Sequence, residues 1–153
     1  MDTDYAKLLS AALTPILGIL MAYIGYQQWH TNDRKVRLDF YERRLAIYLA
    51  AMEFLACIVH RATIRDEELS AFLQKTREGY FLFGRDIADY LDTLYRKAVD
   101  LQAGATMLHD PMGSLPVGEE RSRVARANAE LSEWFGDQFV VTRNKFAKYM
   151  TFS

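Results

Sequence analysis

One long stretch of this sequence, from Leu8 to Trp29, carries no charged side chain. As an α-helix its 22 residues are about 33 Å long, enough to cross the roughly 30 Å hydrocarbon core of a bilayer. A globular helix of this length normally keeps one polar face toward water. The stretch therefore predicts an all-α fold, with an N-terminal transmembrane helix in residues 1–30 and a cytoplasmic antiparallel bundle of about four helices in residues 31–153.

The flanks of the stretch predict its orientation. Three aromatic residues gather at its C-terminal end, where such side chains typically lie at the membrane interface: Tyr23, Tyr26 and Trp29. Five basic residues follow closely: Arg34, Lys35, Arg37, Arg43 and Arg44. The N-terminal flank has Lys7 beside two aspartates. The positive-inside rule then places the N-terminus outside and the bundle in the cytoplasm, with the three aromatic residues, Arg34, Lys35 and Arg37 at the interface.

Three other interpretations compete with a transmembrane helix. A cleaved signal peptide typically has a basic start, a shorter apolar core and a small-x-small cleavage site. This chain starts with acidic residues and has no convincing site before Tyr23. A core helix of a globular protein would carry a polar face, and so would a helix lying in the interface. The stretch has no such face between Leu8 and Tyr26, which favours the transmembrane interpretation.

Small residues recur on one face of the stretch. Ala11, Pro15, Gly18, Ala22 and Gly25 follow one another at spacings of four, three, four and three. Lipid provides no hydrophobic drive for helices to associate, so they associate where small residues allow close backbone approach. We expect this small-residue stripe to pack against a second copy of the helix or a partner membrane protein. The proline is tolerated in a membrane helix when neighbours satisfy the freed carbonyl.

Periodic apolar residues predict the helices of the bundle. The clearest pattern lies between Asp33 and Ala62, where eight positions alternate spacings of three and four: Leu38, Tyr41, Leu45, Tyr48, Met52, Leu55, Val59 and Ala62. We predict that these form the buried face, widened by Phe40, Ile47, Phe54 and Ile58. No proline or glycine separates this helix from Trp29, so the two helices are expected to be nearly continuous.

Three further helices complete the predicted bundle. The first covers Thr63–Arg77, with Thr63 as its N-cap and three acidic residues in its first turn. The second covers Asp86–Leu108, with an apolar face at Ile87, Leu91, Leu94, Tyr95, Ala98, Leu101, Ala105 and Leu108. The third covers Glu119–Met150, with an apolar face at Val124, Ala127, Leu131, Trp134, Phe135, Phe139, Phe146 and Tyr149.

Two segments connect these helices. Tyr80–Phe83 is a short apolar run without a partner strand, so we predict a buried connector or a first helical turn. Proline and glycine between His109 and Gly118 predict an exposed loop.

The junction after the stretch resembles a group of small uncharacterised bacterial inner-membrane proteins. The resemblance is carried by Gln28–Lys35, by Leu38–Arg44 and by Phe81–Gly84 with Ile87, Tyr90 and Leu91. In that group a single span ends in Gln-Trp and a basic helix follows. The resemblance implies this architecture and a bacterial inner-membrane location, and it implies no activity.

No catalytic, cofactor-binding or metal-binding residue is predicted. The three histidines lie in different elements, and none pairs at the spacing typical of a helical metal site. Cys57 and His60 could be neighbours on one helix face, but a lone cysteine there is expected to be inert packing. Aspartates along Asp86–Asp100 lack the Glu-x-x-His motif of two-metal bundles, so a solvated face is predicted.

These features favour a non-enzymatic interaction module held in the membrane, such as an adaptor, an anchor or a sensor subunit. Its expected partners are the lipid bilayer and a second copy or another membrane protein. A net charge of −1 argues against nucleic acid as a partner. The alternative is a membrane-disturbing effector of phage defence or host growth arrest, in which the small-residue stripe would line an assembled bundle.

Overall fold

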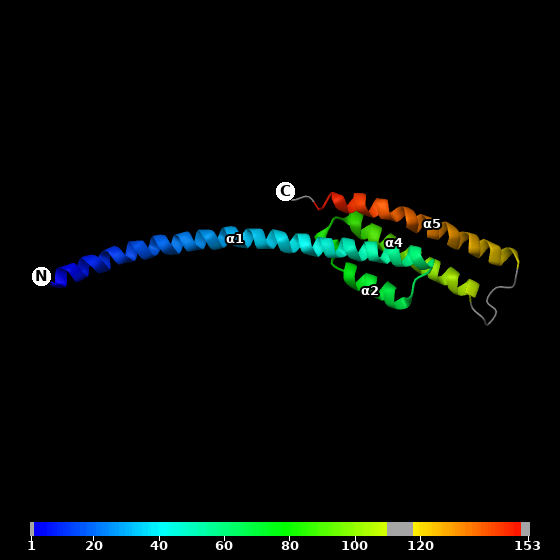
Figure 1. Cartoon of the computed structure of the whole chain (residues 1–153), viewed down its shortest axis with the longest axis horizontal. Coiled ribbons are helices and arrows are strands. Elements are labelled where there is room, and N and C mark those ends of the chain that lie inside the picture. Colours follow the sequence, from blue (N-terminus) through cyan, green and yellow to red (C-terminus); the bar gives the residue numbers. More distant parts are fainter. Residues whose placement is uncertain (1, 110–117, 151–153) are drawn as a thin grey trace. The chain divides into compact units, whose positions relative to one another are not determined.

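The computed structural model describes residues 2–109 and 118–150, and within its first helix it describes the side chains of residue 15, residues 17–29 and residues 35 onward. These residues form five α-helices, and none of them lies in a strand (Figure 1). The helices are α1 (Asp2–Arg61), α2 (Asp66–Thr76), α3 (Gly79–Leu82), α4 (Arg85–His109) and α5 (Glu119–Ala147). The prediction of an all-α fold is confirmed.

Contacts between residues divide the chain into two compact units, Met1–Phe40 and Tyr41–Ser153. The first unit is the N-terminal part of α1. The second unit, which we call the bundle, contains the rest of α1 together with α2 to α5. Its hydrophobic core includes residues from all five of these helices.

Within the bundle, α1 buries only part of the predicted apolar face. Three of the residues expected to widen that face are buried: Ile47, Phe54 and Ile58. Its buried residues are Ile47, Ala50, Ala51, Phe54, Leu55 and Ile58. Of the eight predicted positions only Leu55 is buried, whereas Leu45 and Met52 are half-buried and Val59 is 45% exposed. The eight-residue register was wrong as the centre of the buried face, because this part of α1 is apolar on two opposite sides. Periodicity alone does not say which side faces the other helices.

The connection between α1 and α2 also differs from the prediction. Ala62 follows the end of α1 with φ = 54°, and its N–H donates to the Ile58 carbonyl at 2.7 Å, as in a left-handed C-terminal cap. Thr63 is not the N-cap of α2. Arg65 holds that position, because Ile64 is buried in the core and keeps the preceding residues in the connector.

The short apolar run after α2 forms the helical turn α3 and not a strand. Leu82 and Phe83 are buried, but Tyr80 is 58% exposed and Phe81 is 83% exposed. The run is therefore a connector in which two of the four residues are buried.

The helices α4 and α5 pack along one another, and the periodicity predicted the buried face of α4 correctly. That face contains Ile87, Leu91, Leu94, Ala98 and Leu101. In α5 the predicted core residues Phe135 and Phe146 are buried, while Ala127 is exposed. This helix ends at Ala147 and not at Met150. Most of the predicted loop, residues 110–117, lies outside the described residues.

Candidate functional site

The predicted membrane stretch is described in part, because the side chains of residues 8–14 and of Ile16 lie outside the described residues. All the described residues from Pro15 to Trp29 are exposed, and Ile19 and Trp29 are each 72% exposed. This part of α1 presents large apolar side chains around its surface. Among the residues that the structure describes, no helix has a stretch both long and apolar enough to span a membrane.

The small-residue stripe lies on this exposed surface. Pro15, Gly18, Ala22 and Gly25 are all exposed, and Ala11 lies outside the described side chains. A Cβ atom built on Gly18 or Gly25 would meet no atom within 4 Å. Within its own unit, the stripe therefore has room for another helix to approach the backbone.

The predicted interface residues are exposed wherever they are described. Tyr23 and Tyr26 are each 61% exposed, and Lys35 and Arg37 are exposed as well. The Tyr23 hydroxyl accepts a hydrogen bond from Gln27 at 3.1 Å. The side chain of Arg34 lies outside the described residues.

Two basic residues of the predicted cluster instead belong to the bundle. Arg44 donates hydrogen bonds to the backbone carbonyls of Leu82 at 3.0 Å and Tyr149 at 3.1 Å. Its guanidinium also lies 5.9 Å from the centre of the Phe83 ring. Arg43 pairs with Glu78 at 3.4 Å. Arg44 thus ties α1 to α3 and to the end of α5, a role that the sequence did not predict.

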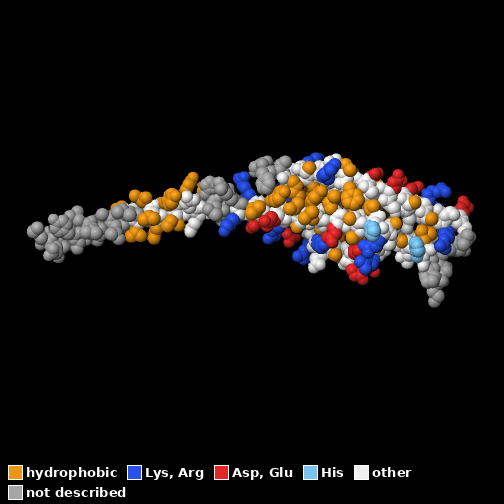
Figure 2. All heavy atoms as spheres, viewed as in Figure 1, with side chains coloured by type: hydrophobic (Ala, Val, Ile, Leu, Met, Phe, Trp, Pro, Cys, Tyr) orange, Lys and Arg blue, Asp and Glu red, His pale blue; other side chains and the backbone are white. Residues whose placement is uncertain are grey.

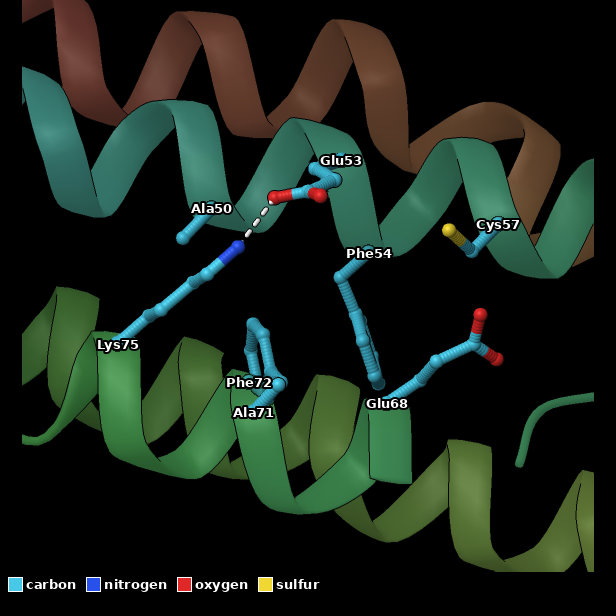
Figure 3. Close-up of a pocket in the computed structure, with 8 residues that line it drawn as sticks. All are labelled: Ala50, Glu53, Phe54, Cys57, Glu68, Ala71, Phe72 and Lys75. Atoms are coloured by element: carbon cyan, nitrogen blue, oxygen red, sulfur yellow. Dashed lines mark hydrogen bonds and ion pairs between the residues drawn. The ribbon is translucent and has the colours of Figure 1, made fainter. Parts of the chain in front are cut away.

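A small cavity lies between α1 and α2 (Figure 3). Its volume is about 90 Å³, and its walls include stacked rings of Phe54 and Phe72 with centroids 4.0 Å apart. Lys75 reaches Glu53 across it, with a nitrogen–oxygen distance of 2.6 Å. Sites for drug-sized ligands are about 300–1,000 Å³, so this cavity suits a few water molecules and not a substrate of that size.

Glu68 lies in the wall of this cavity and is held by two arginines. Its carboxylate pairs with Arg61, with the Arg65 guanidinium at 3.2 Å and with the Arg65 backbone N–H at 3.1 Å. Burial raises the pKa of Glu68, but these hydrogen bonds outweigh burial and lower it to about 2. The carboxylate is therefore a charged clamp between the end of α1 and the first turn of α2.

The cavity does not bring together the groups of a catalytic site. Cys57 is half-buried in its wall with Arg61 nearby, whereas His60 is exposed. Within the described parts of the chain, no group of three or more His, Cys, Asp or Glu side chains could hold a metal ion.

A buried polar group links α4 to α5. The Tyr90 hydroxyl donates to the Gln138 side-chain oxygen at 3.1 Å and lies 2.7 Å from the Thr142 hydroxyl. Gln138 is 5% exposed and Thr142 is fully buried. Burial raises the pKa of Tyr90, against the opposing effect of the Thr142 hydrogen bond. This group fixes how the two helices meet, and no local sequence pattern indicated it.

The aspartates of α4 were predicted to form a solvated face, and Asp86 has a further role. Its carboxylate accepts a hydrogen bond from the Tyr149 hydroxyl at 2.6 Å. That hydrogen bond lowers the pKa of Asp86 and raises the pKa of Tyr149. Tyr149 is thus held at its hydroxyl by α4 and at its carbonyl by Arg44.

Comparison of the chain with protein-family models, with curated proteins and with solved structures finds no match.

Proposed function

We propose that this chain is a membrane-anchored interaction module, in which residues 8–29 cross a bacterial inner membrane and the bundle contacts other proteins. The observation that carries the proposal is the uncharged helical surface of α1 up to Trp29. Eight of its large side chains are 47–72% exposed: Leu17, Ile19, Leu20, Met21, Tyr23, Ile24, Tyr26 and Trp29. Burying such a side chain is favourable by about 1.5–3 kcal/mol, so this surface favours an apolar environment over water.

The basic residues next to this surface support the orientation. Arg43 and Arg44 contact residues of the bundle, and three further cations follow the stretch closely in the sequence: Arg34, Lys35 and Arg37. Each is worth about 1 kcal/mol near an anionic leaflet. The N-terminal flank offers Lys7 beside two aspartates. The imbalance still favours a bundle on the cytoplasmic side.

The bundle is assigned to protein contacts because several of its buried or half-buried polar groups are used to join its own helices. Glu68 is clamped by arginines, Arg44 binds two backbone carbonyls, and Tyr90 bonds to α5. Groups committed in this way hold a shape and are not available for a substrate. Catalytic groups, in contrast, are usually exposed in a cleft with room for a ligand.

Membrane attachment is tested by placing charges in the stretch. We expect the wild-type chain to stay with membranes after an alkaline carbonate wash. A double variant, Leu20→Lys with Ile24→Lys, should move to the wash fraction, since each lysine near a helix centre costs about 2.5–3.5 kcal/mol. Leu73→Lys is the matched control, because Leu73 is similarly exposed at 47% but lies on α2. A wild-type chain released by the wash would overturn the anchor.

Self-association is tested on the small-residue stripe. Amine cross-linking of the full chain in membranes should capture a dimer or larger species, and Gly18→Ile should reduce it by closing the approach to the backbone. Leu20→Ile, on the opposite side of the helix, should leave it unchanged. A monomer in all three proteins would remove self-association from the proposal.

The same open stripe also fits the alternative, a membrane-disturbing effector, because a helix that approaches others closely can line an assembled channel. Overexpression separates the two functions. Loss of membrane potential in cells expressing the wild type but not Gly18→Ile would favour the effector, and unchanged potential would favour the interaction module.

A further inference from the structure

In the bundle, α1 is apolar on the side that faces away from the core as well as on the core side. The core side carries Ile47, Phe54 and Ile58, each at most 3% exposed. The opposite side carries five uncharged residues, Leu45, Leu49, Met52, Ala56 and Val59, which we call the α1 ridge. A helix that is apolar on both sides is normally covered on both sides.

The α1 ridge is substantially open. Leu49 is 54% exposed and Val59 is 45% exposed, Ala56 is exposed, and Leu45 and Met52 are half-buried. The five residues follow one another at spacings of four, three, four and three. This is the spacing of helices that pack side by side through interlocking side chains. The strongest apolar periodicity in the sequence largely falls on this outward side.

The neighbouring helix extends the apolar face. Between α1 and α5 lies a groove of about 240 Å³, whose walls include Leu45, Tyr48, Phe146 and Met150, with Arg143 as the one charged residue among the described residues that line it. On α5, Val140 is 54% exposed. Figure 2 shows hydrophobic side chains gathered in a broad patch over these two helices of the bundle.

We propose that the α1 ridge, with the α1–α5 groove beside it, is the contact surface for a second copy of this chain. The ridge is about 21 Å long, and two adjacent helices are about 20 Å wide with their side chains. Such a face covers roughly 420 Å² of each chain, which is below the roughly 600–800 Å² that the smaller stable interfaces take from each partner. The area therefore fits a weak contact of the size found in transient complexes, which other attachment between the two chains would have to support.

The chemistry of the α1 ridge fits an identical surface. In a two-fold dimer, residues near the axis meet their own copies, so a charge there would repel its copy. Arg143, in the groove, would lie to the side of an axis through the α1 ridge. No residue of the α1 ridge is charged. The nearest carboxylate on the polar flank of α1, Glu53, is paired with Lys75. Two ridges with the same spacing can also interlock without a change of register.

The strength of this contact rests on the proposed function. Anchoring two chains in one membrane and pairing their small-residue stripes would raise the effective concentration of one bundle near the other, which makes a modest contact effective. The contact itself uses different residues from the stripe, so the two surfaces can be tested separately.

The experiment uses the full chain in membranes on a Cys57→Ser background, with a short bis-maleimide cross-linker. Leu49→Cys should give a cross-linked dimer. Leu73→Cys, exposed to a similar extent on α2, should not. Adding Val59→Glu should lower the Leu49→Cys dimer about tenfold, because each copy would then place a carboxylate in an apolar contact. Leu49 and Val59 are both exposed, so we expect the variants to keep their helices. Circular dichroism checks this helical content.

The outcomes distinguish this contact from the anchor. Efficient Leu49→Cys cross-linking that Val59→Glu abolishes supports the α1 ridge. Equal cross-linking at Leu49 and Leu73 would indicate random collision and overturn it. Absence of Leu49→Cys cross-linking, while the Gly18-dependent dimer persists, would overturn the α1 ridge and leave the proposed function intact. Loss of membrane association would instead count against the proposed function.

Discussion

The two units differ in how far they expose their large apolar side chains. From Pro15 to Phe40, the described large apolar residues are exposed, including Trp29 at 72% and Phe40 at 50%. From Tyr41 onward, Phe135, Phe146 and Leu94 are at most 1% exposed. Apolar content alone therefore does not specify a core. A core needs several helices that pack against one another, and the described residues of the first unit form part of one helix only.

The largest expected difference between the two units comes from removing an aromatic ring. Phe135→Ala should lower the free energy of unfolding of the bundle by about 3–5 kcal/mol, since it leaves a cavity in a fully packed site. Met21→Ala, in the exposed stretch, should change it by less than about 0.5 kcal/mol. Urea titration followed by circular dichroism measures both. Equal losses would show that the stretch is part of the cooperative fold.

The next largest difference concerns two cations that are close in sequence. Arg44→Ala should destabilise the bundle by about 2–3 kcal/mol, because the carbonyls of Leu82 and Tyr149 lose a charged donor. Lys35→Ala should have almost no effect on this free energy. A similar effect of the two substitutions in thermal unfolding would argue against the division of the basic cluster into bundle and membrane residues.

A smaller effect is expected from the Glu68 clamp, and it depends on pH. Glu68→Gln should cost about 1 kcal/mol at pH 7, since solvent screens part of the attraction at this partly exposed pair. The pKa of Glu68 is lowered from 4.5 to about 2, so its contribution is full above pH 4.5 and is lost as the pH falls toward 2. Unfolding curves of the two proteins should therefore converge at low pH. A gap that stayed constant with pH would point to lost packing and not to the charge.

The smallest effect is a gain. Ala62→Gly should stabilise the bundle by roughly 0.5–1 kcal/mol, because glycine adopts the left-handed conformation at this cap without strain from a Cβ atom. Ala50→Gly, inside α1, is the control and should destabilise, since it loses helix propensity and buried contact. A loss of stability for Ala62→Gly would contradict the cap assignment.

Much of the fold followed from local patterns. Periodicity located α4 and its buried face, and the acidic first turn located α2 to within a few residues. These signals are strong because one apolar face and one polar face leave a single way to pack. The same rule failed on α1, where Leu45 and Phe54 lie on opposite sides of a helix that is apolar on both.

The polar contacts were not predictable, because each joins residues far apart in sequence. Tyr90 and Gln138 are separated by 48 positions, and either residue alone is unremarkable on a helix. The membrane stretch, its small-residue stripe and the partner surfaces stay predictions, since they depend on an environment outside the chain. The α1 ridge depends on sequence and structure together. The apolar periodicity indicates most of its residues, and their exposure indicates that they face away from the core.

The Arg44–Tyr149 hydrogen bond also has a consequence for the order of events during synthesis. Its two residues are separated by 105 positions. At about 5–20 residues per second, a ribosome needs roughly 5–20 s to add the second partner after the first. Throughout that interval the start of the bundle has an arginine without these acceptors and an incomplete core. The newly made chain therefore has several seconds in which residues 8–29 are complete and the bundle cannot yet close.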